Sequence, residues 1–106
     1  MQRETINRIE ILDTGELLLG LEGPGEPMYA YVYREAAGVY WDPDRHGFRS
    51  TPMREWSCTQ WYKHIVDSVR SGLDVALLLA DHVAWSEVPE PERQAIARLP
   101  GGARRP

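Results

Sequence analysis

One cysteine and three histidines are the strongest candidates for catalysis in this chain of 106 residues. Cys58 falls in the first turn of an expected helix, where the helix dipole lowers the pKa of a thiol and favours a nucleophile. It also belongs to the apolar stripe of that helix, and a buried free cysteine usually behaves as a small hydrophobic residue. His64 lies well around the helix from Cys58 and is not placed to act as its base. We therefore assign no catalytic residue.

The histidines match no zinc-ligand spacing, because His46, His64 and His82 are each separated by 18 residues. Asp81 and His82 directly follow an apolar run, where active-site loops are common. Adjacent residues in an extended chain point to opposite faces, so these two do not form an acid–base pair with each other. His64 and Asp67 share a helix surface at spacing i, i+3. His64, Asp81 and His82 define a competing hypothesis, a small enzyme that uses Asp81 and His82 with an unidentified partner residue.

A short acidic segment resembles an EF-hand calcium loop at a few positions only. Asp42, Asp44, His46 and Gly47 fall on loop positions 1, 3, 5 and 6. Position 12, which must supply a bidentate glutamate, is Met53, and the flanking segments read as strands instead of helices. A polar turn between two strands accounts for the same residues. We expect no metal site and no cofactor.

Aromatic residues give the strongest indication of a binding surface, since nine of the ten lie between positions 29 and 62. Tyrosine and tryptophan bury a large area at low entropic cost while keeping a polar group, and they are enriched at interfaces. We expect an aromatic sheet face that acts as a ligand pocket or a self-association surface. The candidate residues are Tyr29, Tyr31, Tyr33, Trp41 and Trp61.

The charge of the chain argues against nucleic acid as a partner. Residues 1–91 hold 8 basic and 15 acidic side chains, a net charge of −7, whereas residues 92–106 have a net charge of +3. Sheets that stack RNA bases also carry basic residues that meet phosphate, and the acidic body lacks that excess. An acidic body suits a basic protein partner, and it also suits plain solubility.

The chain has no segment typical of export or membrane insertion. The longest apolar run, residues 75–80, is far shorter than the ~20 residues that a membrane-spanning helix needs. Residues 1–5 lack the apolar stretch of a signal peptide. A single cysteine excludes an intramolecular disulfide and favours a reducing compartment. We expect a cytoplasmic protein that does not bind membranes.

The first half of the chain predicts an antiparallel meander of four to five strands. Residues 6–13 and 16–22 alternate in hydrophobicity, and the three-residue loop between them ends in Gly15, which suits a G1-bulge hairpin. This register places Ile9 opposite Leu19 and the apolar sides of both strands together.

The tyrosine-rich segment reads as the next strand, because Tyr29, Tyr31 and Tyr33 alternate with smaller residues over 28–35. A loop ending in Gly38 would pair Tyr33 with Trp41, whereas a two-residue loop would pair Tyr33 with Tyr40. Residues 42–47 then form a turn, and residues 48–50 a short edge strand.

The second half of the chain predicts a helix, a strand and a second helix. Ser57 and Gln60 form a capping box at the start of a helix over 57–71, which Gly72 should end. Residues 75–80 read as a strand buried on both faces, as in the middle of a sheet, and residues 89–99 as a short helix. The α+β domain should cover residues 1–99, followed by a disordered tail over 100–106. The apolar stripe of the first helix comprises Cys58, Trp61, Tyr62, Ile65, Val69 and Leu73.

Residues 29–42, followed by 54–57 and Trp61, resemble small uncharacterised bacterial proteins that are carried on mobile integron gene cassettes. The resemblance rests on the placement of aromatic residues. It implies an accessory bacterial protein, often a compact α+β fold and often dimeric, and it transfers no catalytic residue. Some small acidic bacterial proteins of this type are toxin antidotes that bind a basic partner, which is the alternative function. We expect non-enzymatic binding of a small apolar ligand or a protein partner, and a homodimer.

Overall fold

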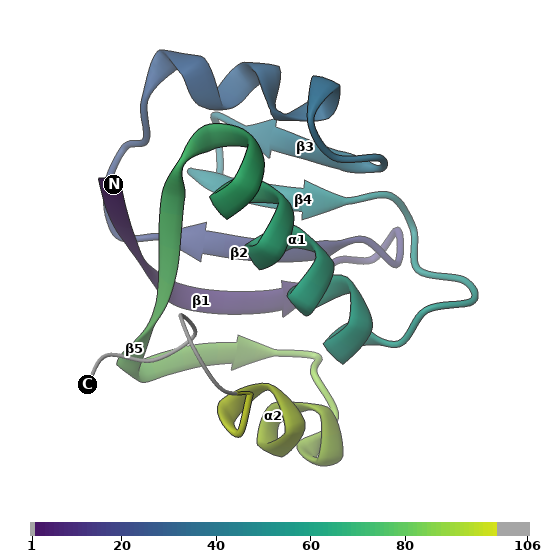
Figure 1. Cartoon of the computed structure of the whole chain (residues 1–106). Helices are drawn as coiled ribbons and strands as arrows, with labels where there is room; N and C mark the ends of the chain where they lie inside the picture. Colours follow the sequence, from purple (N-terminus) through teal and green to yellow (C-terminus); the bar gives the residue numbers. More distant parts are fainter. Residues whose placement is uncertain (1, 100–106) are drawn as a thin grey trace.

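The structure is a computed structural model that describes residues 2–99, and it contains a five-stranded mixed sheet with a helix across one face (Figure 1). The strand order is β3-β4-β2-β1-β5, in which β5 runs parallel to β1 and the other neighbouring pairs are antiparallel. This arrangement confirms the α+β class. The elements are β1 (Gln2–Ile11), β2 (Leu17–Leu21), η1 (Pro27–Arg34), β3 (Val39–Asp42), β4 (Gly47–Ser50), α1 (Cys58–Leu73), β5 (Val75–Ser86) and α2 (Glu90–Ala97).

The first hairpin has the predicted register. Ile9 pairs with Leu19 and Ile11 with Leu17 across β1 and β2. Gly15 adopts φ 87°, a conformation that favours glycine, and its N–H donates to the carbonyl of Leu12 at 2.8 Å. Local turn chemistry and the apolar pattern agree here, and together they determine the pairing.

The predicted tyrosine strand is wrong, because residues 27–34 form the 3₁₀ helix η1, the blue helix at the top of Figure 1. Pro27 begins the helix, where its fixed φ and missing N–H are tolerated. With three residues per turn, Tyr29 and Val32 share the buried face, while Tyr31 and Tyr33 are exposed. The alternation of tyrosines therefore does not correspond to one face of a sheet. The burial of Tyr29 and Val32, which are three residues apart, determines the conformation instead of the alternation.

The second predicted hairpin is also wrong, since neither the Tyr33–Trp41 nor the Tyr33–Tyr40 pairing occurs. Gly38 does adopt φ 77°, but the loop that contains it joins η1 to β3. The hairpin forms instead between β3 and β4, where Trp41 pairs with Phe48. Residues 48–50, predicted as an edge strand, lie between β3 and β2, so β3 is the edge.

Helix α1 begins with the predicted capping box. The Ser57 hydroxyl accepts from the Gln60 N–H at 3.1 Å, and the Gln60 side chain accepts from the Ser57 N–H at 2.7 Å. The helix continues past Gly72 to Leu73 and ends at Asp74, which adopts the left-handed conformation. Gly72 has another role, because a Cβ there would overlap the Cβ of Glu35. It permits the close approach of α1 and the segment after η1.

Strand β5 is longer than predicted and lies at an edge of the sheet. Its first half alternates, with Val75, Leu77 and Leu79 buried and the intervening residues half-buried. The expectation of burial on both faces is therefore wrong, because the residues that alternate with this buried set stay half-buried. Between the pairs Ile6–Leu79 and Arg8–Ala84, residues 80–83 of β5 face a single residue of β1, which makes a bulge.

Helix α2 confirms the predicted terminal helix within a slightly shorter range. Glu92 on α2 accepts from the Thr59 N–H at 2.9 Å and from its hydroxyl at 2.6 Å, which fixes α2 to the first turn of α1. The predicted disordered tail, residues 100–106, lies outside the described residues. Within residues 2–99, no helix is long and apolar enough to cross a membrane.

Candidate functional site

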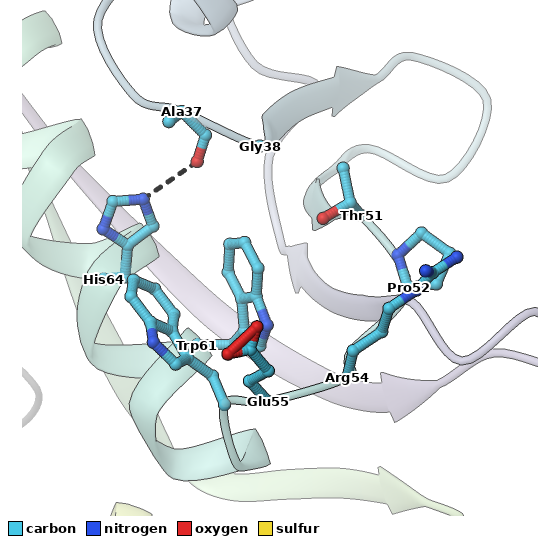
Figure 2. Close-up of a pocket in the computed structure, with 9 residues that line it drawn as sticks. Ala37, Gly38, Thr51, Pro52, Arg54, Glu55, Trp61 and His64 are labelled. Carbon is cyan, nitrogen blue, oxygen red and sulfur yellow. Dashed lines mark hydrogen bonds between the residues drawn. The ribbon is translucent and has the colours of Figure 1, made fainter.

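A hollow of about 560 Å³ opens beside the N-terminal half of α1 (Figure 2). Three parts of the chain form it: the loop between η1 and β3, the segment after β4, and one face of α1. Ligand-binding pockets commonly measure ~300–1,000 Å³, so the hollow has the size of a small-molecule site. Its lining residues are Ala37, Gly38, Thr51, Pro52, Arg54, Glu55, Trp56, Trp61 and His64.

One wall of the hollow is the outer ring cluster, which comprises Trp56, Trp61 and His64. The ring centroids lie 4.9 Å apart for Trp56 and Trp61, 5.1 Å for Trp56 and His64, and 5.5 Å for Trp61 and His64. Trp61 and His64 are three residues apart on α1 and so share a face. The rings meet at steep angles of 58° to 74°, as the electrostatics of aromatic pairs favour.

The start of α1 explains why the two tryptophans meet. Ser57 is the N-cap, so Trp56 precedes the cap and Trp61 is the fourth helical residue. An apolar pair at these two positions is a hydrophobic staple, which fixes the angle at which the chain enters a helix. The capping box and the staple therefore place Trp56 against Trp61 by local interactions.

His64 joins α1 to the loop that closes the hollow. Its Nε2 lies 3.0 Å from the carbonyl oxygen of Ala37, as the dashed line in Figure 2 shows. A carbonyl only accepts, so Nε2 carries the proton and donates. The next residue, Gly38, lies so close that a Cβ there would be 2.9 Å from the Trp61 ring. Hydrogen bond and close contact together hold this loop against the outer ring cluster.

Two charged side chains of opposite sign line the hollow. Arg54 and Glu55 are exposed, and neither makes a hydrogen bond or ion pair with another residue of the described range 2–99. A smaller hollow of about 300 Å³ lies across Trp56, and its charged residues Lys63 and Asp67 pair with each other at 2.7 Å. The two hollows therefore differ electrostatically. In the smaller hollow Lys63 and Asp67 neutralise each other, whereas in the larger hollow Arg54 and Glu55 remain unpaired within residues 2–99.

The five predicted ligand residues do not share one surface. Only Trp61 lines the hollow. Tyr29 and Trp41 belong to a core ring cluster with Phe48, in which the centroids are 5.0 to 5.4 Å apart. Tyr31 and Tyr33 lie elsewhere, on the exposed side of η1. The strand prediction grouped residues that the 3₁₀ helix separates.

Tyr29 is a structural residue. Its side chain is fully buried, and its hydroxyl donates to Glu4 at 2.5 Å and accepts from Gln2 at 3.0 Å. Burial raises the pKa of the Tyr29 hydroxyl, and the hydrogen bond with Glu4 raises it further. The phenol therefore stays protonated and acts as a hydrogen-bonded part of the core.

The polar candidates are also separated. His64 lines the hollow, whereas Asp81 and His82 lie exposed in the bulge of β5 and contribute nothing to its lining. Asp67 does share a surface with His64, as predicted, since both line the smaller hollow across Trp56, and its carboxylate pairs with Lys63. The sequence could not place the bulge, because it arises from pairing between β1 and β5.

Cys58 and Asp42 both have structural roles instead of catalytic or metal-binding ones. Burial, with a contribution from Glu92, raises the pKa of the Cys58 thiol to about 12, which disfavours the thiolate. The Asp42 carboxylate accepts from the N–H groups of Asp44 and Arg45 and from the side chains of Arg45 and Arg49. Within residues 2–99, no three histidine, cysteine, aspartate or glutamate residues are grouped so as to hold a metal ion.

Sequence reasoning missed Arg54, Glu55 and Trp56 as site residues. The staple pattern around the capping box was a usable signal for Trp56, because it predicts contact between residues 56 and 61. No comparable signal existed for Thr51 and Pro52, because they meet the other lining residues through long-range contacts such as the hydrogen bond from the Thr51 N–H to the Gly38 carbonyl.

Comparison with known proteins identifies the family to which the chain is related. The family model described as Integron Cassette Protein Hfx_Cass5 matches residues 9–83, which include the whole hollow. A solved structure of Integron Cassette Protein Hfx_Cass5, from the mobile metagenome of North West Arm Sewage Outfall, is 34% identical. That match covers 89% of this chain and 91% of the other, with a TM-score of 0.42. No protein of curated function matches. The chain belongs to the Hfx_Cass5 family of integron cassette proteins.

Proposed function

We propose that the protein is a non-enzymatic accessory protein that binds a small ligand with an aromatic or apolar body in the hollow. The observation that carries this proposal is the outer ring cluster, which forms one wall of a space of about 560 Å³. Trp56 in this wall is 43% exposed. A staple needs only an apolar contact, so two tryptophans supply more aromatic surface than the start of α1 requires.

The polar groups around the hollow favour binding over catalysis. Of the histidines in the described residues 2–99, His64 alone lines it, and its protonated nitrogen donates to the Ala37 carbonyl. Cys58 lies on the buried face of α1 with a raised pKa. The competing enzyme would use Asp81 and His82, which lie outside the hollow. Arg54 and Glu55 also line the hollow, but the hydrogen bonds of His64 go to Ala37 and Ser68, so these groups form no acid–base pair with it. An aromatic wall of this kind suits a pocket that orients a ligand without reacting with it.

Indole is a suitable probe for this proposal, because it is apolar, planar and able to stack on tryptophan. We expect indole to stabilise the protein in a thermal-shift assay, and a ligand at 100 times its Kd adds ~2.7 kcal/mol. Trp56→Ala should remove the shift. Tyr40→Ala is the matched control, since Tyr40 is 44% exposed and lies outside the hollow. Absence of any shift with a broad set of apolar and aromatic compounds would contradict the proposal.

We also propose that the protein forms a homodimer through the exposed side of η1. Tyr31 and Tyr33 are each 52% exposed, and the Arg34 guanidinium lies 4.8 Å and 5.8 Å from their ring centroids. Tyrosine and arginine are enriched at protein interfaces, where planar side chains bury area at low entropic cost.

Light scattering at known protein concentration tests this second proposal. We expect the mass of two chains, and Tyr31→Ser combined with Tyr33→Ser should reduce it to that of one chain without loss of the indole response. A monomeric mass for the unsubstituted protein throughout a concentration series would contradict the dimer. A cytoplasmic location remains part of the proposal, supported by a single cysteine that is buried and free.

A further inference from the structure

The charges at the rim of the hollow restrict the class of ligand. Arg54 and Glu55 are neighbours in sequence, yet they form no ion pair with each other. Figure 2 draws Arg54 on the Pro52 side of the hollow and Glu55 on the Trp61 side. One cation and one anion are thus presented to the same space, and neither is neutralised by another residue of the described chain.

The smaller hollow across Trp56 provides an internal comparison. It shares Trp56 and His64 with the larger hollow, and it also contains one cation and one anion. There, Lys63 and Asp67 are four residues apart on α1 and pair at 2.7 Å. In that pair each charge already has a partner, so neither is left for a ligand. Arg54 and Glu55 precede the helix, where no such spacing brings them together.

A ligand that complements the larger hollow needs three features. It needs a planar apolar body for the outer ring cluster, an anionic group for the Arg54 guanidinium, and a cationic group for the Glu55 carboxylate. A guanidinium binds a carboxylate through paired N–H donors. An ammonium group suits the carboxylate of Glu55 and also the faces of the tryptophan rings.

Resting on the proposed function, we propose that the ligand is a small zwitterion with an aromatic body, of the chemical class of the aromatic α-amino acids. Its ring lies against Trp56 and Trp61, its carboxylate binds Arg54, and its ammonium group binds Glu55. A ligand that carries only a carboxylate would pair with Arg54 and leave Glu55 without a partner. A ligand that carries only an ammonium group would pair with Glu55 and leave Arg54 without a partner.

Four probes with the same ring system separate these contributions: indole, tryptamine, indole-3-propionate and tryptophan. Titration calorimetry with each should rank tryptophan first, tryptamine and indole-3-propionate lower, and indole lowest. An exposed ion pair contributes up to about a fivefold change in affinity, so each charge should raise the affinity by up to that factor. High salt should reduce the advantage of tryptophan over indole.

Matched variants assign each charge to one residue. Arg54→Gln should bring tryptophan down to the affinity of tryptamine, and Glu55→Gln should bring it down to that of indole-3-propionate. Arg70→Gln is the control. Arg70 is an exposed cation of α1 that lines neither hollow and forms no ion pair within residues 2–99, so its loss should leave the ranking unchanged. These surface substitutions replace exposed side chains, so the fold should survive, which circular dichroism would verify.

The outcomes distinguish the two proposals. Equal binding of indole and tryptophan, with loss of both in Trp56→Ala, would overturn the zwitterion and leave the aromatic site standing. Tryptamine or indole-3-propionate binding as tightly as tryptophan would also overturn it, in favour of a singly charged ligand. No binding of any of the four probes would overturn the zwitterion proposal. The aromatic site would be contradicted as well only if the broad set of apolar and aromatic compounds also gave no thermal shift.

Discussion

The core ring cluster and the outer ring cluster contain three rings each at similar spacing, yet only one is closed. Centroid distances are 5.0 to 5.4 Å for Tyr29, Trp41 and Phe48, and 4.9 to 5.5 Å for the three outer rings. In the core, Tyr29 of η1 packs against Trp41 and Phe48, and its hydroxyl is hydrogen-bonded by residues of β1. Outside, no element within residues 2–99 covers the ring faces that line the hollow. Ring packing is therefore common to both clusters, and the covering element determines whether aromatic surface is buried in the core or left exposed in the hollow.

The largest expected effect is a difference in stability between variants of the two ring clusters. Phe48→Ala removes a fully buried ring, and substitutions of this kind lower the free energy of unfolding by ~3–5 kcal/mol. Trp56→Ala removes a partly exposed ring whose pairing with Trp61 contributes ~0.5–1.5 kcal/mol. Chemical denaturation of both variants measures the difference. Equal losses would mean that the outer ring cluster also supports the core.

An intermediate effect is expected where the backbone meets the outer ring cluster. Gly38 has φ 77°, a conformation that costs other residues ~1–2 kcal/mol, and an added Cβ would lie 2.9 Å from Trp61. Gly38→Ala should lower stability by about that amount and weaken indole binding, because Trp61 must move. Gly15→Ala is the matched control, since Gly15 also has a positive φ of 87° and a Cβ there would meet only Pro52, at an ordinary contact distance of 3.9 Å. It should lower stability without weakening indole binding. An unchanged indole affinity in Gly38→Ala would show that the position of Trp61 is not critical.

The smallest effect concerns Asp42, which follows Trp41 and anchors the hairpin that carries two rings of the core cluster. Burial alone would raise the pKa of Asp42, but hydrogen bonds from Arg45 and the charges of Arg49 and Arg45 outweigh it and lower the pKa below its ordinary value. A lowered pKa stabilises the fold at pH values above the ordinary value, and the contribution is lost as pH falls through the pKa of the folded state.

Comparison with Asp42→Asn measures this contribution, because the amide keeps an oxygen for the turn N–H groups and loses the charge. The stability difference between the two proteins should be constant near neutral pH and should shrink below pH ~4. A difference that does not change with pH would mean that the charge of Asp42 contributes nothing to the stability of the core hairpin.

Local interactions made part of this structure predictable. The hairpin around Gly15 and the capping box of α1 depend on neighbouring residues, and both occur as expected. The path of residues 27–34 was not predictable from alternation, because three tyrosines at a spacing of two fit a strand as well as an exposed turn. Burial of Tyr29 against Trp41 and Phe48 selects the 3₁₀ helix, and both of those partners lie more than ten residues away.

The sequence by itself determined the elements that short-range chemistry controls: the first hairpin, the capped helix and, through the staple, the contact between Trp56 and Trp61. It also determined the acidic charge of the folded body. Only the tertiary structure decided which aromatic residues are covered. Tyr29 of η1 packs against Trp41 of β3 and Phe48 of β4 and so belongs to the core, whereas Tyr31 and Tyr33 are exposed. Residues 51, 52 and 54–56, which follow β4, line the hollow beside α1. Coverage depends on long-range pairing, which no local pattern encodes.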